Sequence, residues 1–174
     1  MDTNLDNIQE QINQRNDQDN QVLSFLLGAE EYGVDILTVQ EIKGWEKTTA
    51  IPNTPDYVMG VINLRGAVVP IIDLRVRFGL SHITYNDSTV VIILRAQDPT
   101  GSQKIIGLVV DGVSDVYSLN ESEIQSAPDM NGTIHTDYVN GLATVAEKMI
   151  VVLNVDQLIN EGILASIKQT INKE

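Results

Sequence analysis

Paired carboxylates are the side chains in this sequence that could serve as a general acid and base. Glu30 lies beside Glu31, and Glu121 lies close to Glu123. Acid–base catalysis needs carboxyl groups that converge on one reacting centre. Both pairs lie in acidic, turn-like segments, where a solvated face is the common outcome. The sequence therefore predicts no catalytic carboxylate pair.

Hydroxyl and imidazole groups are present, but their spacing supports no nucleophilic site. Ser24, Ser88 and Ser114 lack a Gly-x-Ser-x-Gly elbow, and His82 and His135 lie in polar loops. With two histidines and no cysteine, neither a histidine-rich metal site nor thiolate chemistry can be built. Glycine-rich phosphate-binding motifs are also absent. We therefore expect a protein that is not an enzyme and that binds no cofactor or metal.

The overall charge narrows the choice of partners. The chain has 174 residues, with 24 acidic and 11 basic side chains and a net charge of −13. Nucleic acid and anionic membranes would be repelled by most of such a surface. No apolar run approaches the roughly 18 residues needed to span a bilayer. These features predict a cytoplasmic protein that does not insert into membranes.

Three arginines form the one local basic feature of this acidic chain. Arg65, Arg75 and Arg77 lie close together, either as a basic patch or as ordinary solubilising charges. Arg65 stands at a corner, because residues 57–64 carry apolar side chains at helix-like spacing, Gly66 permits a sharp reversal, and residues 68–72 form a β-branched run. Arg65 is thus either a solvated turn residue or a fixed contact.

Short strands dominate the chain after residue 20, and residues 1–19 read as a flexible tail because they are rich in Asn, Gln and Asp. A helix is the alternative there, since Leu5, Ile8 and Ile12 are spaced by three and four. The expected strands are 22–27, 32–36, 67–74, 89–95, 104–110, 113–117 and 149–154. A polar turn at 98–102 predicts a hairpin over 89–110. Many short strands favour small closed barrels.

Two helical segments are expected among these strands. A short helix is predicted over 37–42, with Asp35 as its cap. A longer one is predicted over 156–171, with Ile163, Ile167 and Ile171 on one face and Gly162 as a point of kinking. The apolar face of the longer helix is expected to pack on its own barrel, and binding of a partner is the alternative.

An ordered set of motifs over about residues 20–160 resembles the CheW-like adaptor family of bacterial chemotaxis. The matching segments are 30–37, 39–42, 51–55, 57–75, 85–87, 107–116 and 138–142. The resemblance implies a mainly β fold of two interlocked five-stranded SH3-like barrels, with short helices and a C-terminal helix. It divides the chain into a tail (1–19), a CheW-like domain with two barrel subdomains (20–160) and a C-terminal helical extension (161–174).

The resemblance also implies a function: a non-enzymatic adaptor that couples methyl-accepting chemoreceptors to the histidine kinase CheA, in receptor arrays at the inner face of the membrane. Family members bind the regulatory domain of the kinase with one barrel and receive the receptor's cytoplasmic tip in a groove near the junction of the barrels. The matching positions for kinase binding are Val39, Glu41, Ile42 and Gly60. Those for receptor binding are Arg65, Val90, Val113 and Val116.

Structural roles are open for several of these positions. Val39 and Ile42 could be the core face of their helix, and Gly60 could be required because a side chain would clash. The valines on strands can face either the core or a groove. Two other functions stay open: a paralogue serving a surface-motility pathway, and a module that binds a small ligand at the barrel junction.

Overall fold

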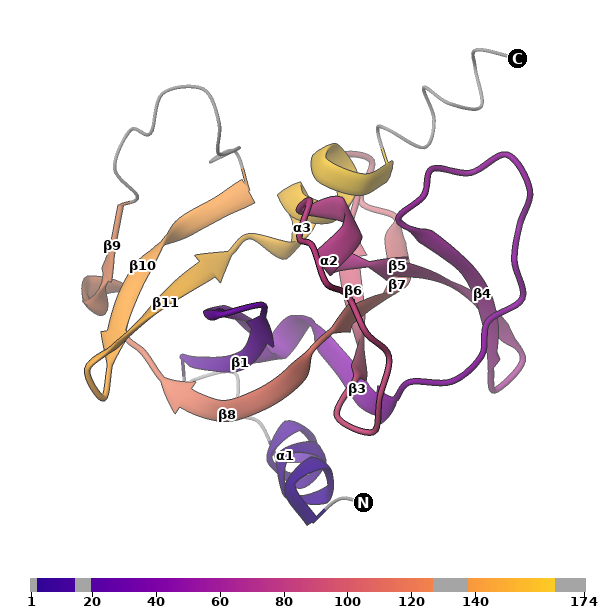
Figure 1. Cartoon of the computed structure of the whole chain (residues 1–174). Coiled ribbons are helices and arrows are strands. Elements are labelled where there is room, and N and C mark those ends of the chain that lie inside the picture. The colour runs from indigo at the N-terminus through magenta and orange to yellow at the C-terminus, as the bar shows by residue number, and fades with distance from the viewer. Residues whose placement is uncertain (1–2, 15–19, 127–137, 165–174) are drawn as a thin grey trace.

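Two β-sheets form the body of the protein in the computed structural model, which describes residues 3–14, 20–126 and 138–164 (Figure 1). Sheet A has six strands in the order β8-β1-β2-β11-β10-β9. Their bounds are β1 Gln21–Leu27, β2 Glu30–Asp35, β8 Gly112–Ser118, β9 Ile124–Gln125, β10 Val139–Val145 and β11 Lys148–Leu153. Within the described residues, no helix is long and apolar enough to cross a membrane.

Sheet B has five strands in the order β3-β6-β7-β5-β4. Their bounds are β3 Val39–Gly44, β4 Val58–Leu64, β5 Ala67–Asp73, β6 Val90–Gln97 and β7 Gln103–Val110. Thr49, in the segment after β3, exchanges two backbone hydrogen bonds of 2.9 Å with Val61 of β4. The end strands of sheet B are β3 and β4. Because these bonds join β4 to the segment that follows β3, sheet B closes on itself.

The two sheets are interlocked by the path of the chain. Strands β3 to β7 are inserted between β2 and β8, so sheet A is completed only by the second half of the sequence. Each sheet contains one parallel pair, β2 with β11 and β5 with β7. The predicted mainly β fold of two interlocked units is confirmed, although one sheet has six strands because β9 adds two residues.

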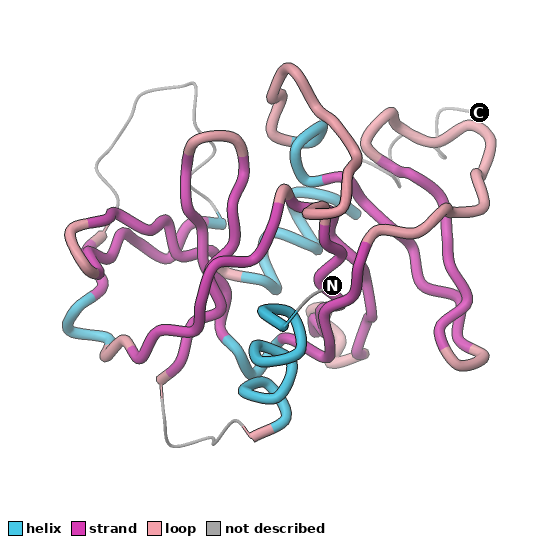
Figure 2. Tube along the Cα trace, turned by 60° about the horizontal axis from the view of Figure 1, so that its bottom comes forward, coloured by secondary structure: helices cyan, strands magenta, loops and turns pink. Residues whose placement is uncertain are grey.

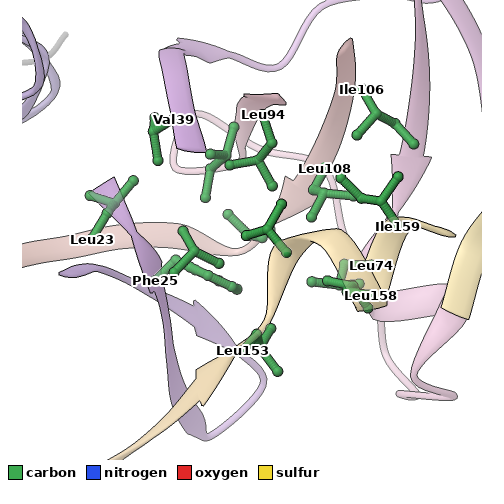
Figure 3. Packing of buried hydrophobic residues seen from close by; sticks show 14 of the residues in the cluster. Leu23, Phe25, Val39, Leu74, Leu94, Ile106, Leu108, Leu153, Leu158 and Ile159 are labelled. Carbon is green, nitrogen blue, oxygen red and sulfur yellow. The ribbon is translucent and has the colours of Figure 1, made fainter. Parts of the chain in front are cut away.

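Strand β6 shows how the core is organised. Val90, Ile92 and Leu94 face the largest apolar cluster, which fills the space between the sheets, whereas Val91 and Ile93 face a second cluster inside sheet B. Both faces of β6 are therefore buried, which explains its uninterrupted apolar sequence. Figure 3 shows the first cluster, to which both sheets and the C-terminal helical turns contribute.

All seven predicted strands and the predicted hairpin over 89–110 are present. The helix-like spacing of the apolar residues in 57–64 does not reflect a helix, because residues 58–64 form β4. A register shift between Val58 and Gly60 places an extra residue in β4 and gives the apolar positions their helix-like spacing. Burial of Gly60, Ile62 and Leu64 shows the two-residue period of a strand.

The short helix predicted over 37–42 is a single 3₁₀ turn, Ile36–Thr38 (η1). Asp35 caps this turn as predicted, since its carboxylate accepts a 2.9 Å hydrogen bond from the Leu37 N–H. Strand β3 begins directly afterwards, and a register shift between Val39 and Glu41 allows both Val39 and Ile42 to face the core.

The flexible tail predicted for residues 1–19 is wrong over α1, Thr3–Asn13. The helical alternative is the correct one there, because Ile8 and Ile12 are buried in the core between the sheets and Leu5 packs against it. Residues 15–19 lie outside the described part of the chain.

The last helix begins near the predicted residue, as α3 Val155–Gln157, and continues as a π-helical turn, Leu158–Leu164 (η4). Asn154 caps it by accepting a 3.1 Å hydrogen bond from the Gln157 N–H. Leu158, Ile159 and Ile163 are fully buried in the core, so the apolar face packs on the protein itself. Ile167 and Ile171 lie outside the described residues.

Candidate interaction surface

Glu41 and Arg65, which the sequence assigned to two different surfaces, form an ion pair. Glu41 lies on β3, and Arg65 lies in the two-residue turn between β4 and β5. Arg65 Nη2 donates to Glu41 Oε1, and Nη1 lies 3.5 Å from Oε2. The guanidinium therefore spans both carboxylate oxygens, which is the geometry in which arginine binds carboxylates best.

The turn itself places Arg65 in this position. Arg65 and Gly66 both have positive φ angles, 51° and 89°, which match the twist of the flanking strands. Asn63 fixes the turn, because its side-chain oxygen accepts a 2.9 Å hydrogen bond from the Gly66 N–H. Arg65 is thus a fixed contact on the surface rather than a freely solvated side chain.

The pair remains accessible to a partner. The Arg65 side chain is 66% exposed and the Glu41 side chain 21%. The hydrogen bond from Arg65 lowers the pKa of Glu41 below its ordinary value, and the same bond raises the pKa of Arg65. Both groups are therefore charged at neutral pH, and a partner carrying a carboxylate or an arginine can compete for either one.

The predicted valines and Ile42 belong to the core. Val39 and Val90 are fully buried, Ile42 and Val113 nearly so, and Val116 packs against the same cluster from a half-buried position. In the free chain, the geometry therefore supports the alternative that these residues belong to the core. Of the eight predicted site residues, only Glu41, Arg65 and Val116 are more than marginally accessible.

Gly60 is required by the backbone. Its φ is 129°, and a Cβ added there would overlap the carbonyl group of Thr49. That close approach is the one that links β4 to the segment after β3. Gly60 therefore allows the close approach of β4 to Thr49 that closes sheet B.

Sequence reasoning missed a second arginine site, centred on Arg75. This side chain is only 1% exposed and forms two hydrogen bonds, 3.0 and 2.9 Å long, to the carboxylate of Asp73. It also donates to Asp111 Oδ1 at 2.9 Å and to the Thr84 carbonyl at 2.7 Å. Burial disfavours its charge, but the bonds to Asp73 and Asp111 outweigh that effect and raise the pKa of Arg75.

This buried site joins the two sheets. Asp111 lies between β7 of sheet B and β8 of sheet A, and its other oxygen accepts a 2.7 Å hydrogen bond from the Gly28 N–H between β1 and β2. Tyr85 covers the site, with its hydroxyl 2.6 Å from Asp73 Oδ2 and its ring 4.8 Å from the Arg75 guanidinium. Burial and the bond to Asp73 raise the pKa of Tyr85 to about 12.

The hypothesis that Arg65, Arg75 and Arg77 form a local basic patch is wrong. Arg75 is buried, and Arg77 is half-buried, where its Nε donates a 2.6 Å hydrogen bond to the Gly162 carbonyl in the last helix. The guanidinium of Arg77 also lies over the Tyr57 ring. The three arginines thus make contacts in three separate parts of the structure, and of the three only Arg65 presents its charge on the surface.

The candidate catalytic residues do not converge. Glu31 is buried beside Ser24, whereas Glu30 is exposed. Glu123 caps a 3₁₀ turn, Glu121–Glu123 (η2), by accepting from the Asn120 N–H at 3.1 Å. Among the described residues, no group of three His, Asp or Glu side chains is arranged to hold a metal ion. His135 lies outside them.

Comparisons with known proteins identify the family of this chain. Residues 21–162 match the CheW-like domain. The chain is 47% identical over 143 residues to a chemotaxis protein CheW of Klebsiella aerogenes, covering 82% of this chain and 83% of that protein. It is 35% identical over 146 residues to a probable chemotaxis protein CheW of Rhizobium etli, covering 84% and 91%.

A solved structure shares the fold. The scaffolding protein TtCheW from Thermoanaerobacter tengcongensis aligns with a TM-score of 0.72 at 33% identity, over 85% of this chain and 93% of that one. The chain therefore shares its fold of two interlocked β-sheets with that protein. The chain belongs to the CheW-like domain family.

Proposed function

We propose that this protein is a non-enzymatic scaffold of bacterial chemotaxis that couples chemoreceptors to the histidine kinase CheA. The observation that carries the proposal is the 47% identity, over most of both chains, to a protein named chemotaxis protein CheW. The expectation of a non-enzymatic protein agrees with a structural relative described as a scaffolding protein.

The kinase-binding surface proposed here is the outer side of β3 and the adjoining part of β4. Glu41 supplies an accessible carboxylate on this surface. Val39, Ile42 and Gly60 act indirectly, because the first two fix the path of β3, which carries Glu41, and Gly60 fixes the path of β4. An accessible charged group on a rigid strand favours specificity more than raw affinity.

The receptor-binding surface is proposed to include Arg65 and the neighbouring seam between the sheets. Arg65 is the exposed guanidinium that can meet acidic groups on a receptor tip. Val90, Val113 and Val116 belong to the apolar cluster behind that seam. Because Arg65 pairs with Glu41, the two proposed surfaces meet at one ion pair.

Signalling would then require no chemistry in this chain. Each interface is expected to be modest, with a dissociation constant of about a micromolar, and the assembly gains stability because three proteins hold one another. A change in receptor state would reach the kinase as a change in position, which a rigid two-sheet body transmits. Its place would be the cytoplasm, at the inner face of the membrane in receptor arrays.

A paralogue in a surface-motility pathway would use the same surfaces. The receptors that it binds would distinguish such a paralogue from a chemotaxis adaptor. A small-ligand module has less support. Three of the surface hollows among the described residues have volumes of about 160, 260 and 280 Å³. These volumes fall below the roughly 300 to 1,000 Å³ of ordinary ligand sites.

Calorimetric titration with the isolated regulatory domain of a CheA kinase tests the proposal. Glu41→Lys should weaken binding about tenfold or more, because it places a positive charge where the kinase surface meets a carboxylate. Glu46→Lys is the matched control, since Glu46 is also an accessible carboxylate near β3, paired with Lys43. Equal affinity for all three proteins, or an equal loss in both variants, would contradict the proposed surface.

A further inference from the structure

Helix α1 lies across the seam between the two sheets. It contacts β3, the end strand of sheet B, and β8, the end strand of sheet A. Figures 1 and 2 show the helix beside these strands, outside both sheets. An end strand leaves one row of backbone groups unpaired, and covering it with a helix is one way in which proteins protect such an edge.

The contacts of α1 are those of an amphipathic helix in a groove. Ile8 and Ile12 are 1% and 0% exposed, and Leu5 packs beside them. Gln9 makes a polar contact with the strand edge, because its side-chain oxygen accepts a 2.9 Å hydrogen bond from the Ile42 N–H of β3. Asp6, Asn7, Glu10 and Gln11 are exposed on the other face.

The helix depends on this docking for its stability. It has 11 residues, and isolated helices shorter than about 12 to 15 residues are marginal in water. Its Asn and Asp side chains favour turns over helix interiors. The helix is held by a short apolar stripe and the Gln9 hydrogen bond, so another helix with the same pattern could replace it.

The seam beneath α1 is also where the proposed partner residues gather. The cluster that receives Ile8 and Ile12 contains Val39, Ile42 and Val113, with Val116 packed against it. In the free chain α1 contributes to the burial of this cluster. An incoming apolar helix therefore meets a site already filled by a segment of the same chain.

We propose that α1 is an intramolecular occupant of a helix-binding groove between β3 and β8, and that an amphipathic helix of the receptor tip binds there by displacing it. This inference rests on the proposed function, because the receptor supplies the competing helix. The displaced state is a minority in the free protein, and the apparent affinity for the receptor is reduced by that fraction.

The test compares three full-length chains titrated with a soluble helical hairpin carrying the cytoplasmic tip of a chemoreceptor. Ile8→Asp/Ile12→Asp should undock α1, whereas Asn7→Asp/Gln11→Asp adds the same charges at the same spacing on the exposed face. Hydrogen exchange of the Ile42 amide reports undocking independently, because that amide donates to Gln9. We expect faster exchange and about tenfold tighter hairpin binding only in the first variant.

Gln9→Ala provides a milder variant, should the buried aspartates disturb the sheets; it should raise Ile42 exchange and tighten binding about twofold. Displacement of α1 from the wild-type chain by the hairpin, seen as coil-like α1 amide shifts, supports the proposal. Hairpin binding that leaves α1 docked, or that is unchanged or weaker in the undocked variants, overturns it and leaves the adaptor function standing. Failure of every chain to bind the hairpin contradicts the receptor half of the proposed function, and this inference with it.

Discussion

Arg65 and Arg75 make the same kind of bond in opposite surroundings. Each guanidinium binds a carboxylate, Glu41 in one case and Asp73 in the other. The Arg65 side chain is 66% exposed, whereas that of Arg75 is 1% exposed and has a second carboxylate partner, Asp111. One pair lies on the surface of sheet B, and the other joins the two sheets.

The difference in surroundings separates function from stability. Breaking a buried ion pair leaves an uncompensated charge in the core, which is strongly destabilising. An exposed pair contributes little to folding, because water and salt screen each charge. The surface pair is therefore free to exchange one member for a group on a partner, whereas the buried pair fixes the body that holds the surface.

The largest effect is expected from Arg75→Met. The variant leaves Asp73 buried without its cation, so the free energy of unfolding should fall by about 3 to 5 kcal/mol. Urea unfolding measures this loss. Arg95→Met is the control, because half-buried Arg95 makes a single hydrogen bond within the described residues, 3.4 Å long, to the Leu37 carbonyl. A loss below about 1 kcal/mol for Arg75→Met would remove the contrast between the two sites.

Gly60→Ala should be next in size. An alanine there combines a positive φ with overlap on Thr49, and we expect a loss of about 2 to 3 kcal/mol. Gly66→Ala has the positive φ alone, and Gly44→Ala has neither constraint, so thermal or urea unfolding should rank the losses Gly60, Gly66, Gly44. Equal losses at Gly60 and Gly66 would show that the close approach to Thr49 is unimportant.

The pH dependence of stability tests the role of Tyr85, which covers the buried Asp73–Arg75 site. The pKa of Tyr85 is raised to about 12, so the folded state holds the phenolic proton more tightly than the unfolded chain does. Its contribution is complete below pH 10 and is lost as pH rises from about 10 to 12. Because Tyr85 is 42% exposed, solvent screening reduces the effect to about 1 kcal/mol.

Tyr85→Phe isolates this contribution from that of other tyrosines, such as Tyr32, whose pKa burial also raises. Between pH 9 and 12, the unfolding free energy of the wild type should fall more steeply than that of the variant. Parallel curves would mean that the Tyr85 hydroxyl is not coupled to the Asp73–Arg75 pair.

The smallest effect on stability is expected at the surface pair. Arg65→Gln and Glu41→Gln should unfold at the same urea concentration as the wild type, within error, because the pair is exposed. Binding should behave differently, because each of these two variants should weaken partner binding. The charge-swapped variant Glu41→Arg/Arg65→Glu should rebuild the ion pair but should not restore partner binding. Restored binding in the charge-swapped chain would show that the pair acts only by holding the turn.

Local patterns allowed the central strands to be predicted, but contacts distant in sequence did not follow from them. The β-branched runs around β5, β6 and β7 were long enough to identify strands directly. Register shifts gave both β3 and β4 a helix-like spacing of apolar residues, and the helix predicted over 37–42 was wrong for that reason. The partner of Arg75 at position 111 is set by the fold, and no local signal distinguishes Arg75 from Arg65.

Helix α1 is a second case in which contacts distant in sequence decide the structure. Asn- and Gln-rich residues around three apolar side chains do not form a stable helix alone, so a tail was the natural prediction. The seam that buries Ile8 and Ile12 exists only after both sheets have formed. The Glu41–Arg65 contact likewise needed the β4–β5 turn and β3 to be placed side by side.

Backbone amide NMR during titration with the CheA regulatory domain tests the central claim most directly. We expect shifts concentrated on β3 at residues 39–42, near Gly60 and in the turn at Arg65 and Gly66, and their loss in the still-folded Glu41→Lys chain. No binding at about several hundred micromolar, or shifts confined to sheet A, would contradict it.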